Sequence, residues 1–412
     1  MREYKTKNNK LLWAGQNVDE LAANFGTPLF VYDEKQIIQS VKELSAGPWE
    51  IHYAVKANPS PEILKTLLKY NIGIDAVSAN EVEYAISLGF DPKKIVYTSS
   101  SLSDDEAKRV TDKGVLVNVN SFEEIELLGK LVEGINIGIR INPNVIAGHH
   151  KHTQTAGEIS KFGVHLVDMP KAVEIAAKYN LKITMAHFHI GSCILDAQLF
   201  IQAFQTVLET IKKLELPNLT HINLGGGFGT PYHPNENRLD LKHLVAEISK
   251  LHLEFEKNTG KKTKLVIEPG RYLVNESGIL LVNLNSISRN HQRFFYRTNS
   301  GFNHLIRPTM YGSYHHFING SKVAGPSEKV ILSGNICEGG DVFNSEPREI
   351  TVGEHNDTIV IFDVGAYGVS MGMSLYNLKG LPAEVIIKDN GSVLQFAKAQ
   401  DLSDILSRYI LE

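Results

Sequence analysis

The chain has 412 residues, of which 42% are hydrophobic and 21% are charged, and its formal net charge is −4. This composition can build a full core, while the length suggests two or three ordinary domains or one large α/β barrel with a smaller partner. The near-neutral charge argues against a nucleic-acid-binding surface, and two cysteines exclude a disulfide framework. No signal-like or membrane-spanning apolar run occurs in the sequence, so we expect a cytoplasmic protein that contacts no membrane.

From residue 51 to residue 273, short apolar segments alternate with longer amphipathic ones. Apolar side chains at three- and four-residue spacing, such as Ile63, Leu67 and Leu68, predict helices in the longer segments. The expected strands are residues 51–56, 72–77, 94–98, 115–120, 135–142, 183–190, 221–224 and 265–268. The expected helices are residues 61–70, 81–88, 122–131, 170–179, 198–214 and 241–257. This alternation predicts a (β/α)8 barrel, with a doubly wound open sheet as the alternative.

After residue 273 the pattern becomes mainly that of β-structure. The expected strands are residues 278–286, 294–297, 329–332, 357–362 and 383–387. Asn390-Gly391, between residues 385–388 and 393–396, predicts a tight hairpin. Residues 29–32 can add a strand to this β-rich part. The predicted organisation is an N-terminal segment over residues 1–33 that contributes to the β domain, a barrel over 34–275, and a C-terminal mainly β domain over 276–412.

Barrel enzymes gather their chemistry at the C-terminal ends of the strands, so we considered those positions in order. The first strand ends at Lys56, where desolvation predicts a lowered pKa and a free amine for a Schiff base; an ion-paired structural lysine is the alternative. The sixth strand carries His187 and His189, which share one face of a strand. Such a pair can bind a metal, but no further His or Cys marks the other strand ends, and we expect no metal.

The last two strands end in a glycine run and a carboxylate. Gly225, Gly226 and Gly227 leave backbone N–H groups open to an anion where barrels usually bind phosphate, although a triple glycine alone is equally a tight turn. Glu268 and Arg271 follow the eighth strand, and a buried ion pair between them is the alternative to a functional role. Together, a lysine, an imidazole, a phosphate cradle and a carboxylate form the set that pyridoxal phosphate requires.

These motifs resemble, in their order along the chain, the fold-type III pyridoxal-phosphate decarboxylases, an alanine-racemase-like family that includes the diaminopimelate, ornithine and arginine decarboxylases. The resemblance runs from residue 25 nearly to the C-terminus. It implies pyridoxal 5'-phosphate as cofactor and an obligate homodimer with shared active sites. It further implies that Lys56 binds the cofactor covalently, that His189 stacks on its ring and that Glu268 contacts the pyridine nitrogen. The other residues implied around the cofactor are Ser192, Gly225, Gly226, Gly227, Gly270, Arg271 and Tyr367.

The C-terminal domain most resembles that of the diaminopimelate decarboxylases. Arg307-Pro-Thr-Met-Tyr311 is similar to their substrate-binding Arg-Pro-x-x-Tyr, and Cys337-Glu338-Gly-Gly-Asp to their Cys-Glu-Ser-x-Asp. The resemblance implies that Cys337 donates a proton and that Glu338 binds the distal amine, both in the site of the neighbouring subunit. Residues 153–163 resemble the mobile active-site loop of this group. Arg271 and Tyr367 are implied in substrate binding as well.

A diamino diacid carries a distal ammonium and a distal carboxylate, so its site needs an acid and a guanidinium together. Glu338 and Arg307 supply these groups, which favours decarboxylation of meso-diaminopimelate to L-lysine and CO2. Thr98-Ser-Ser-Ser101 and Gly339 depart from the pattern of that group and leave open another basic amino acid or a siderophore or antibiotic intermediate as substrate. A racemase and a non-enzymatic homologue are the remaining alternatives, and Cys193 has no assigned role.

Overall fold

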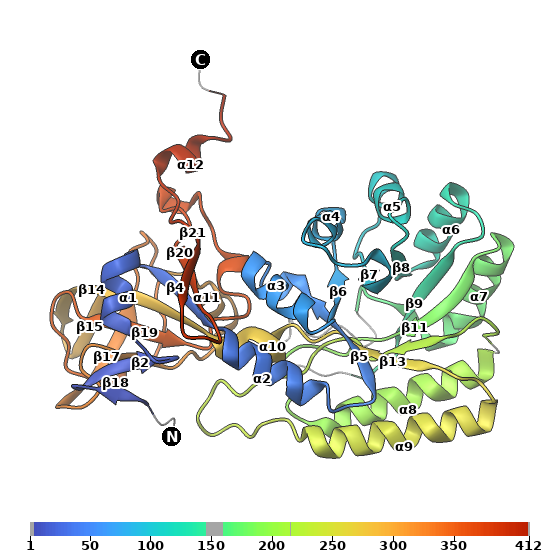
Figure 1. Ribbon diagram of the computed structural model, residues 1–412, viewed down its shortest axis with the longest axis horizontal. Coiled ribbons are helices and arrows are strands. Elements are labelled where there is room, and N and C mark those ends of the chain that lie inside the picture. Colours follow the sequence, from blue (N-terminus) through green and yellow to red (C-terminus); the bar gives the residue numbers. More distant parts are fainter. Residues whose placement is uncertain (1–3, 146–159, 215, 411–412) are drawn as a thin grey trace.

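The computed structural model describes residues 4–145, 160–214 and 216–410. Figure 1 shows a helix-covered barrel beside a β-rich part that contains both chain ends. The strands of the barrel, in pairing order, are β5 (Trp49–Ala54), β6 (Gly73–Ala76), β7 (Ile95–Tyr97), β8 (Leu116–Val119), β9 (Asn136–Asn142), β11 (Lys182–His187), β12 (His221–Asn223) and β13 (Lys264–Ile267). All pair in parallel, and β13 pairs with β5 to close the ring. The predicted (β/α)8 barrel is therefore confirmed, and the open sheet is wrong.

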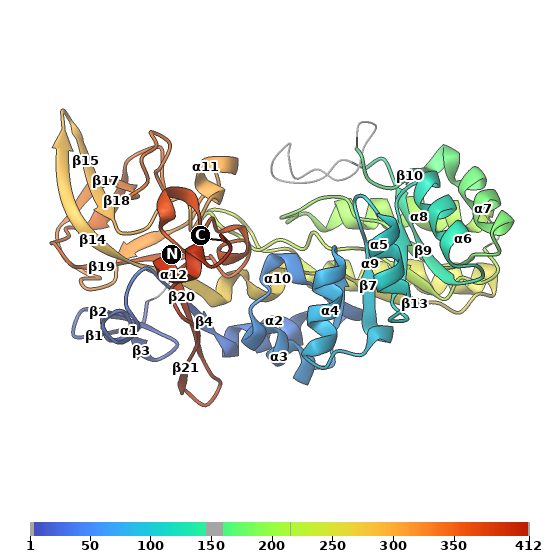
Figure 2. The same ribbon diagram turned by 90° about the horizontal axis from the view of Figure 1, so that it is seen from above.

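Helices cover the outside of the barrel, as Figure 2 shows from above. They are α2 (Glu34–Leu44), α3 (Pro61–Lys69), α4 (Ala79–Ser87), α5 (Asp104–Thr111), α6 (Phe122–Leu131), α7 (Met169–Lys178), α8 (Ala197–Leu214) and α9 (Leu241–Thr259). Serine side chains cap the starts of α4, α5 and α6 by accepting hydrogen bonds from backbone N–H groups. The charged helix α5 begins at Asp104 and buries only Ala107 and Val110. None of the described helices has the length and apolar character needed to cross a membrane.

The β-rich part is organised around one long strand, β14 (Gly278–Asn290). The other strands are β4 (Leu29–Asp33), β15 (Arg293–Thr298), β16 (Phe317–Asn319), β17 (Ser327–Ser333), β18 (Arg348–Thr351), β19 (Thr358–Phe362), β20 (Ala383–Ile387) and β21 (Val393–Ala397). The smaller elements near the chain ends and in the β-rich part are β1 (Thr6–Lys7), β2 (Lys10–Trp13), β3 (Gln16–Asn17), α1 (Val18–Phe25), α11 (Arg307–Tyr311) and α12 (Leu402–Leu406). Two further short elements belong to the barrel: β10 (Val164–His165), which pairs with β9, and α10 (Arg271–Val274), which follows β13. Strand β4 pairs with β14 and β20, so segments far apart in the sequence share this sheet.

Two features of the β-rich part follow from local sequence. The Asn390-Gly391 hairpin is confirmed, since Lys388 donates its N–H to the Ser392 carbonyl at 2.8 Å and Gly391 has a φ of +85°. The strand expected at residues 29–32 is β4. The domain boundaries at 33/34 and 275/276 stay predictions.

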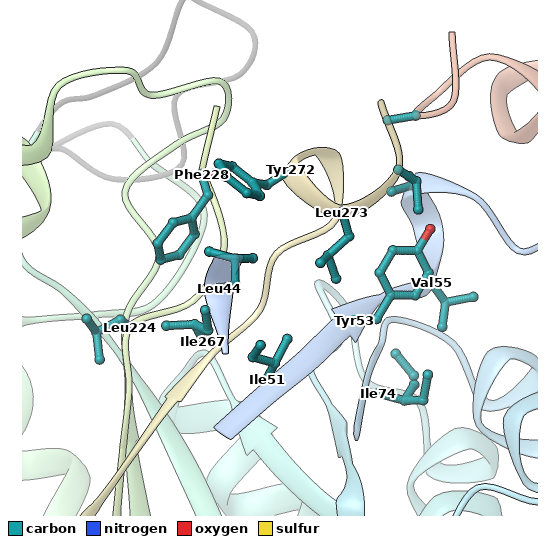
Figure 3. Close-up of a cluster of buried hydrophobic side chains, with 14 of the residues drawn as sticks. Leu44, Ile51, Tyr53, Val55, Ile74, Leu224, Phe228, Ile267, Tyr272 and Leu273 are labelled. Atoms are coloured by element: carbon teal, nitrogen blue, oxygen red, sulfur yellow. The ribbon is translucent and has the colours of Figure 1, made fainter. Parts of the chain in front are cut away.

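A buried apolar cluster fixes the segment that follows β13. Figure 3 shows Leu44 of α2, Ile51 of β5 and Ile267 of β13 close to Tyr272 and Leu273 of α10. Each of these side chains is buried. Helix α10 begins directly after the Glu-Pro-Gly turn, and its side chains pack against α2 and the outer face of the barrel. This packing holds the start of α10, and the arginine that occupies it, at the barrel mouth.

Candidate active site

A pocket of about 430 Å³ lies at the C-terminal ends of the barrel strands and extends to the β-rich part. The expected site residues that line it are Lys56, His189, Ser192, Gly226, Gly227, Glu268, Gly270, Arg271, Arg307, Tyr311 and Tyr367. Gly225 lies directly behind this lining, where its N–H donates to Asn223 Oδ1 at 2.9 Å. Cys337 and Glu338 do not line the pocket of their own chain. Residues from widely separated strands thus meet in one pocket.

Lys56 lies in the turn after β5, and Asp75 lies in the neighbouring strand β6. Lys56 Nζ is 3.6 Å from Asp75 Oδ2, and 46% of the lysine side-chain surface remains exposed. Burial by itself would lower the pKa of Lys56, but Asp75, Tyr367 and Glu268 together raise it by more, so the net shift is upward. The lowered pKa expected from the sequence is therefore wrong, because that expectation counted burial without the acid on the next strand. Burial and Glu268 raise the pKa of Asp75 to about 7.

Glu268 forms a fixed carboxylate at the floor of the pocket. His187 Nε2 is 2.9 Å from Glu268 Oε2, and Asn223 donates from Nδ2 to Oε1 at 2.7 Å. Burial alone would raise the pKa of Glu268, but His187, Lys56 and the Asn223 hydrogen bond lower it to about 2. Burial lowers the pKa of His187, and its Nε2 donates to the Glu268 carboxylate, which can only accept. Glu268 therefore remains ionised across the physiological pH range.

The glycine run approaches its neighbours too closely for any side chain. A Cβ on Gly225 would lie 2.3 Å from the Phe188 carbonyl oxygen, and one on Gly226 would lie 2.4 Å from the Glu268 carbonyl oxygen. Gly226 donates its N–H to His189 Nδ1 at 3.0 Å. His189 itself lies beyond the end of β11, so the strand expected at 183–190 is too long. The run is a turn built for close backbone approach, and it orients the imidazole beside it.

Two buried arginines form the pocket wall that faces the β-rich part. Arg271 donates to Tyr232 Oη and, at 3.2 Å, to Ser192 Oγ. Arg307 Nη1 is 2.9 Å from His315 Nε2. Among the residues that the structure describes, no carboxylate forms an ion pair with either guanidinium. The expected alternative of a Glu268–Arg271 ion pair is therefore wrong.

Tyr367 connects the β-rich part to the turn that carries Lys56. Its N–H donates to the Ala57 carbonyl at 2.8 Å, and Arg271 Cζ lies 4.8 Å from the centre of its ring. Its backbone is left-handed, with a φ of +59°, a conformation that residues other than glycine, asparagine and aspartate adopt uncommonly. The hydrogen bond to Ala57 holds this conformation and points the ring into the pocket.

Cys337 and Glu338 are exposed, on a loop that Asp341 holds in shape. Asp341 accepts from the N–H of Phe302 and from the N–H of Ile336, each at 2.7 Å. Glu338 Oε1 accepts from Tyr376 Oη at 2.8 Å. The loop thus presents its thiol and carboxylate outward rather than into the pocket of the same chain. Of the expected mobile loop, residues 153–159 lie outside the described residues.

Sequence reasoning missed several groups that belong to the pocket. Asp75 and Arg140 line it, and Asn223 orients Glu268 from behind. Burial lowers the pKa of Arg140 to about 10, and its guanidinium lies 4.6 Å from the Phe162 ring centre. Each of these polar residues interrupts a run of apolar residues in a barrel strand. Such an interruption near a strand end is the signal that could have identified them.

The donor set of this pocket fits pyridoxal phosphate. Lys56 supplies an amine and Glu268 an ionised carboxylate, and Ser192 and Gly227 line the same pocket. The N–H groups of Gly225 and Gly226 already donate to Asn223 and His189, so they are not open to an anion as the sequence suggested. Arg140 Nη2 and Arg271 Nε are buried polar atoms without a hydrogen-bond partner in the described part of the chain. Buried donors of this kind are usually satisfied by a bound anion or by water. The fold and this pocket together define the class of barrel enzymes that use pyridoxal phosphate.

Comparisons with known proteins agree with this class. Residues 34–275 match the family model described as pyridoxal-dependent decarboxylase, pyridoxal binding domain, and the chain belongs to this decarboxylase family. It is 36% identical to the diaminopimelate decarboxylase of Methanothermobacter thermautotrophicus over 408 residues, which covers 96% of this chain and 94% of the relative. It is 32% identical to the diaminopimelate decarboxylase of Escherichia coli K12 over 411 residues, which covers 96% of this chain and 97% of the relative.

Solved structures give the same result. The crystal structure of the Methanocaldococcus jannaschii diaminopimelate decarboxylase in complex with L-lysine has a TM-score of 0.92 and 31% identity. The match covers 99% of this chain and 98% of that one. The Helicobacter pylori diaminopimelate decarboxylase, also complexed with L-lysine, has a TM-score of 0.86 and 30% identity, and the match covers 95% of this chain and 98% of that one. The resemblance therefore extends over the barrel and the β-rich part together.

Proposed function

We propose that this protein is a pyridoxal-phosphate-dependent carboxy-lyase that converts meso-diaminopimelate to L-lysine and CO2. The main observation in favour of this substrate is a pair of buried guanidiniums, Arg271 and Arg307. They lie on one wall of the pocket that contains Lys56. Buried cations without an anionic partner favour a ligand that brings its own negative charge. A substrate with a second carboxylate, beyond the one that leaves, supplies that charge. The names of the relatives and their lysine complexes support the same assignment.

In this proposal the barrel end of the pocket holds the cofactor. Lys56 binds it covalently, His189 packs on its ring, and Glu268 holds a proton on its ring nitrogen. Its phosphate lies against Ser192 and against the backbone of Gly225, Gly226, Gly227 and Gly270. When bound there, pyridoxal phosphate acts as an electron sink for the bond that loses CO2. The ionised state of Glu268 matters most, because a carboxylate keeps a neighbouring ring nitrogen protonated.

The opposite wall binds and orients the substrate. Arg307 and Tyr311 hold the distal carboxylate, Arg271 reaches both this carboxylate and the cofactor, and Tyr367 lies between substrate and cofactor. An arginine suits this task because it donates two parallel hydrogen bonds to one carboxylate and stays charged. Fixing the distal end orients the scissile bond, so binding free energy lowers the barrier at the reacting carbon. The serine-rich segment after β7 lines the same pocket with Thr98, Ser99 and Ser100.

We also propose that two chains form a homodimer in which Cys337 and Glu338 complete the pocket of the partner. Both side chains are exposed, and neither lines the pocket of its own chain. Exposed apolar side chains surround their loop, which favours burial against a second copy. They are Met310, Met373, Leu375, Tyr376 and Leu378. In the dimer, the Cys337 thiol donates the proton that replaces CO2, and the Glu338 carboxylate binds the distal ammonium. The expected cytoplasmic location stays a prediction.

The shared site can be tested by mixing two inactive variants. Lys56→Ala and Cys337→Ala each remove one half of every site, so each homodimer should be inactive. If subunits exchange at random, half of the dimers combine both variants and each of these has one complete site, which restores roughly a quarter of wild-type activity. No recovery, despite exchange demonstrated by differently tagged subunits, would contradict the shared site.

The substrate is tested by CO2 release from purified protein supplied with pyridoxal phosphate. We expect kcat/KM for meso-diaminopimelate to exceed the values for L-lysine, L-ornithine and L-arginine by at least about a hundredfold, since those substrates leave the buried arginines unpaired. Chiral analysis of the remaining substrate in the same reactions detects racemisation. An equal or reversed preference would reject diaminopimelate as the substrate while leaving the decarboxylase assignment intact.

A further inference from the structure

The two guanidiniums of the pocket wall lie on the ring of one tyrosine. Arg307 Cζ is 4.5 Å from the centre of the Tyr232 ring, and Arg271 Cζ is 5.5 Å from it. The Tyr232 hydroxyl accepts from Arg271 and donates to Asn275 Oδ1 at 2.7 Å. Tyr232 is itself 8% exposed. One buried ring therefore contacts both cations, and its hydroxyl is fixed from the far side.

A buried histidine supports Arg307 from another direction. His315 Nδ1 is 2.9 Å from the Phe362 carbonyl oxygen, which accepts only, so Nδ1 carries the proton. His315 Nε2 is then the acceptor for Arg307 Nη1, at 2.9 Å. Burial, with Arg307 adding to it, holds the pKa of His315 well below its usual range. The imidazole ring also packs edge-on against Tyr232, with ring centres 5.2 Å apart.

Both arginine side chains lie between two cavities, so their orientation depends on the side chains that contact them. A second cavity, of about 390 Å³, lies next to the active-site pocket. Arg271, Arg307 and Tyr311 line both cavities and form the partition between them. Arg271 also donates to Ser192 Oγ and Arg307 to Ser313 Oγ, each at 3.2 Å. Loss of the tyrosine hydroxyl or of the imidazole would leave these serine contacts and would give the guanidinium more freedom to turn into the second cavity.

Because Tyr232 and His315 are uncharged, they also leave the positive charge of the two arginines available to a substrate carboxylate. A carboxylate at the place of either partner would hold an arginine equally well, but it would cancel much of the field that a substrate carboxylate experiences. The carboxylate on the same loop, Glu236, accepts from the backbone N–H groups of Tyr232 and His233, at 2.8 and 2.9 Å. It thus fixes the loop that carries the tyrosine and forms no ion pair with the arginines among the described residues.

We propose that Tyr232 and His315 are positioning residues that aim Arg271 and Arg307 at the second carboxylate of the substrate without neutralising them. This inference rests on the proposed function, because it concerns recognition of a diacid. Neither residue needs to touch the substrate. Their effect is on the direction of the two guanidiniums, and it should therefore appear in the affinity for a second carboxylate and in KM rather than in the chemical step.

The test uses the holoenzyme and two matched inhibitors, pimelate and hexanoate, which share a carbon chain and differ by one terminal carboxylate. The ratio of their inhibition constants isolates the second carboxylate. Tyr232→Phe keeps the ring and removes the hydroxyl. His315→Asn keeps a donor near Nδ1 but loses the acceptor for Arg307, whereas His315→Gln keeps an acceptor near Nε2. Cofactor content and melting temperature are measured for each variant to detect general damage.

We expect Tyr232→Phe and His315→Asn each to lower the preference for pimelate and to raise KM for meso-diaminopimelate by roughly tenfold, with kcat changed by less than about threefold, because each removes a hydrogen bond to a charged group. His315→Gln should recover most of the loss seen in His315→Asn. The two positions are independent tests, so one variant that fails to fold leaves the other informative.

Three outcomes overturn the inference in distinguishable ways. If wild-type enzyme prefers pimelate and uses meso-diaminopimelate, but both folded variants retain the wild-type preference, the positioning role is wrong and the proposed function stands. If wild-type enzyme neither prefers pimelate nor releases CO2 from meso-diaminopimelate, the proposed function fails, and the positioning role fails with it. Equal losses for pimelate and hexanoate would indicate a merely structural role and would also contradict the inference.

Discussion

The pocket has two walls: the first, at the barrel end, carries Lys56 and Glu268, and the second, facing the β-rich part, carries Arg271 and Arg307. The charged groups of these two walls have different kinds of partner. At the barrel end, Lys56 lies 3.6 Å from Asp75, and Glu268 lies 2.9 Å from His187, so each charge has a titratable partner. On the facing wall, Arg271 and Arg307 are held by a tyrosine and a neutral histidine. Paired charges have protonation states set by the protein, which suits chemistry at a cofactor. Buried cations without an anionic partner can bind an anionic ligand, which suits recognition of the substrate. Changes at the first wall should therefore alter kcat, and changes at the second should alter substrate choice.

The largest effect is expected from Glu268→Gln. The variant keeps the shape and the hydrogen-bonding capacity of the side chain but loses the negative charge that the wild-type pKa of about 2 guarantees. We expect kcat to fall by roughly 10²–10³, the size of loss that follows removal of one preorganised electrostatic group. Steady-state CO2 release measures this, and Glu276→Gln, outside the pocket, is the control. An unchanged kcat would show that the charge of Glu268 does not contribute to catalysis.

Arg307→Ala should change substrate choice more than the rate of the chemical step. Removing one bidentate cation from a buried carboxylate site should raise KM for meso-diaminopimelate by about a hundredfold. Use of D- or L-lysine, which lacks the distal carboxylate, should change by less than about threefold. The exposed Arg289→Ala variant is the control for loss of an arginine as such. An unchanged ratio between the two substrates would show that the second wall does not recognise the diacid.

Asp75→Asn tests the electrostatics of the first wall through stability. The pKa of Asp75 is about 7 in the fold against an ordinary value of 3.8, so the folded state prefers the protonated acid. The corresponding stabilisation is present at low pH and is lost as the pH rises from about 4 through about 7. The asparagine variant does not titrate, so its melting temperature relative to wild type should increase over this interval.

The difference of about three pKa units corresponds to roughly 4 kcal/mol. A free-energy change of about 1 kcal/mol moves the melting temperature of a chain of 150–250 residues by roughly 2–4 °C, and of a longer chain by less. Thermal unfolding of cofactor-free protein between pH 4 and pH 9 measures the difference between variant and wild type. A difference that stays constant over the whole range would mean that Asp75 titrates normally, and that Lys56 does not lie beside a perturbed acid.

The smallest effect is expected from Lys388→Ala, which breaks a charge cluster outside the pocket. Lys388 Nζ is 2.6 Å from Glu62 Oε2 and 3.6 Å from Glu34 Oε1, and it joins the β20–β21 hairpin to barrel helices. Lys65 and Lys69 still compensate the two acids, so unfolding free energy should fall by about 1 kcal/mol. Denaturant unfolding measures the loss. Any change in the preference for meso-diaminopimelate would show that specificity is not confined to the arginine wall.

The sequence predicted those parts of the site that sit at the ends of regular strands. Lys56, His189 and Glu268 follow apolar segments whose parallel order brings their ends together, so a barrel prediction already places them at one mouth. Arg307 and Tyr367 came from motifs of the resembling family, since their position depends on how the β-rich part packs on the barrel. The sequence predicted a strand at residues 29–32, but which strands it pairs with, β14 and β20, leaves no local signal in the chain.

What the sequence could not supply is the partner of each charged group. The pKa of Lys56 was expected to fall, but it is raised, because Asp75, Tyr367 and Glu268 together outweigh burial. Tyr232 and His315 were not expected at the site, although Tyr232 follows the glycine run by only a few residues. A tyrosine in a loop and a histidine in a His-His pair are ordinary in sequence. Only their distances to Arg271 and Arg307 give them a role.

The attachment of the cofactor to Lys56 is the claim on which both walls depend. Borohydride reduction of protein loaded with pyridoxal phosphate, followed by digestion and peptide mass spectrometry, locates the lysine that carries the phosphopyridoxyl group. The pocket geometry predicts label on the peptide that contains Lys56, and no label at that stoichiometry in Lys56→Ala. Stoichiometric label on another lysine, or none in protein that retains its fold, would contradict this assignment.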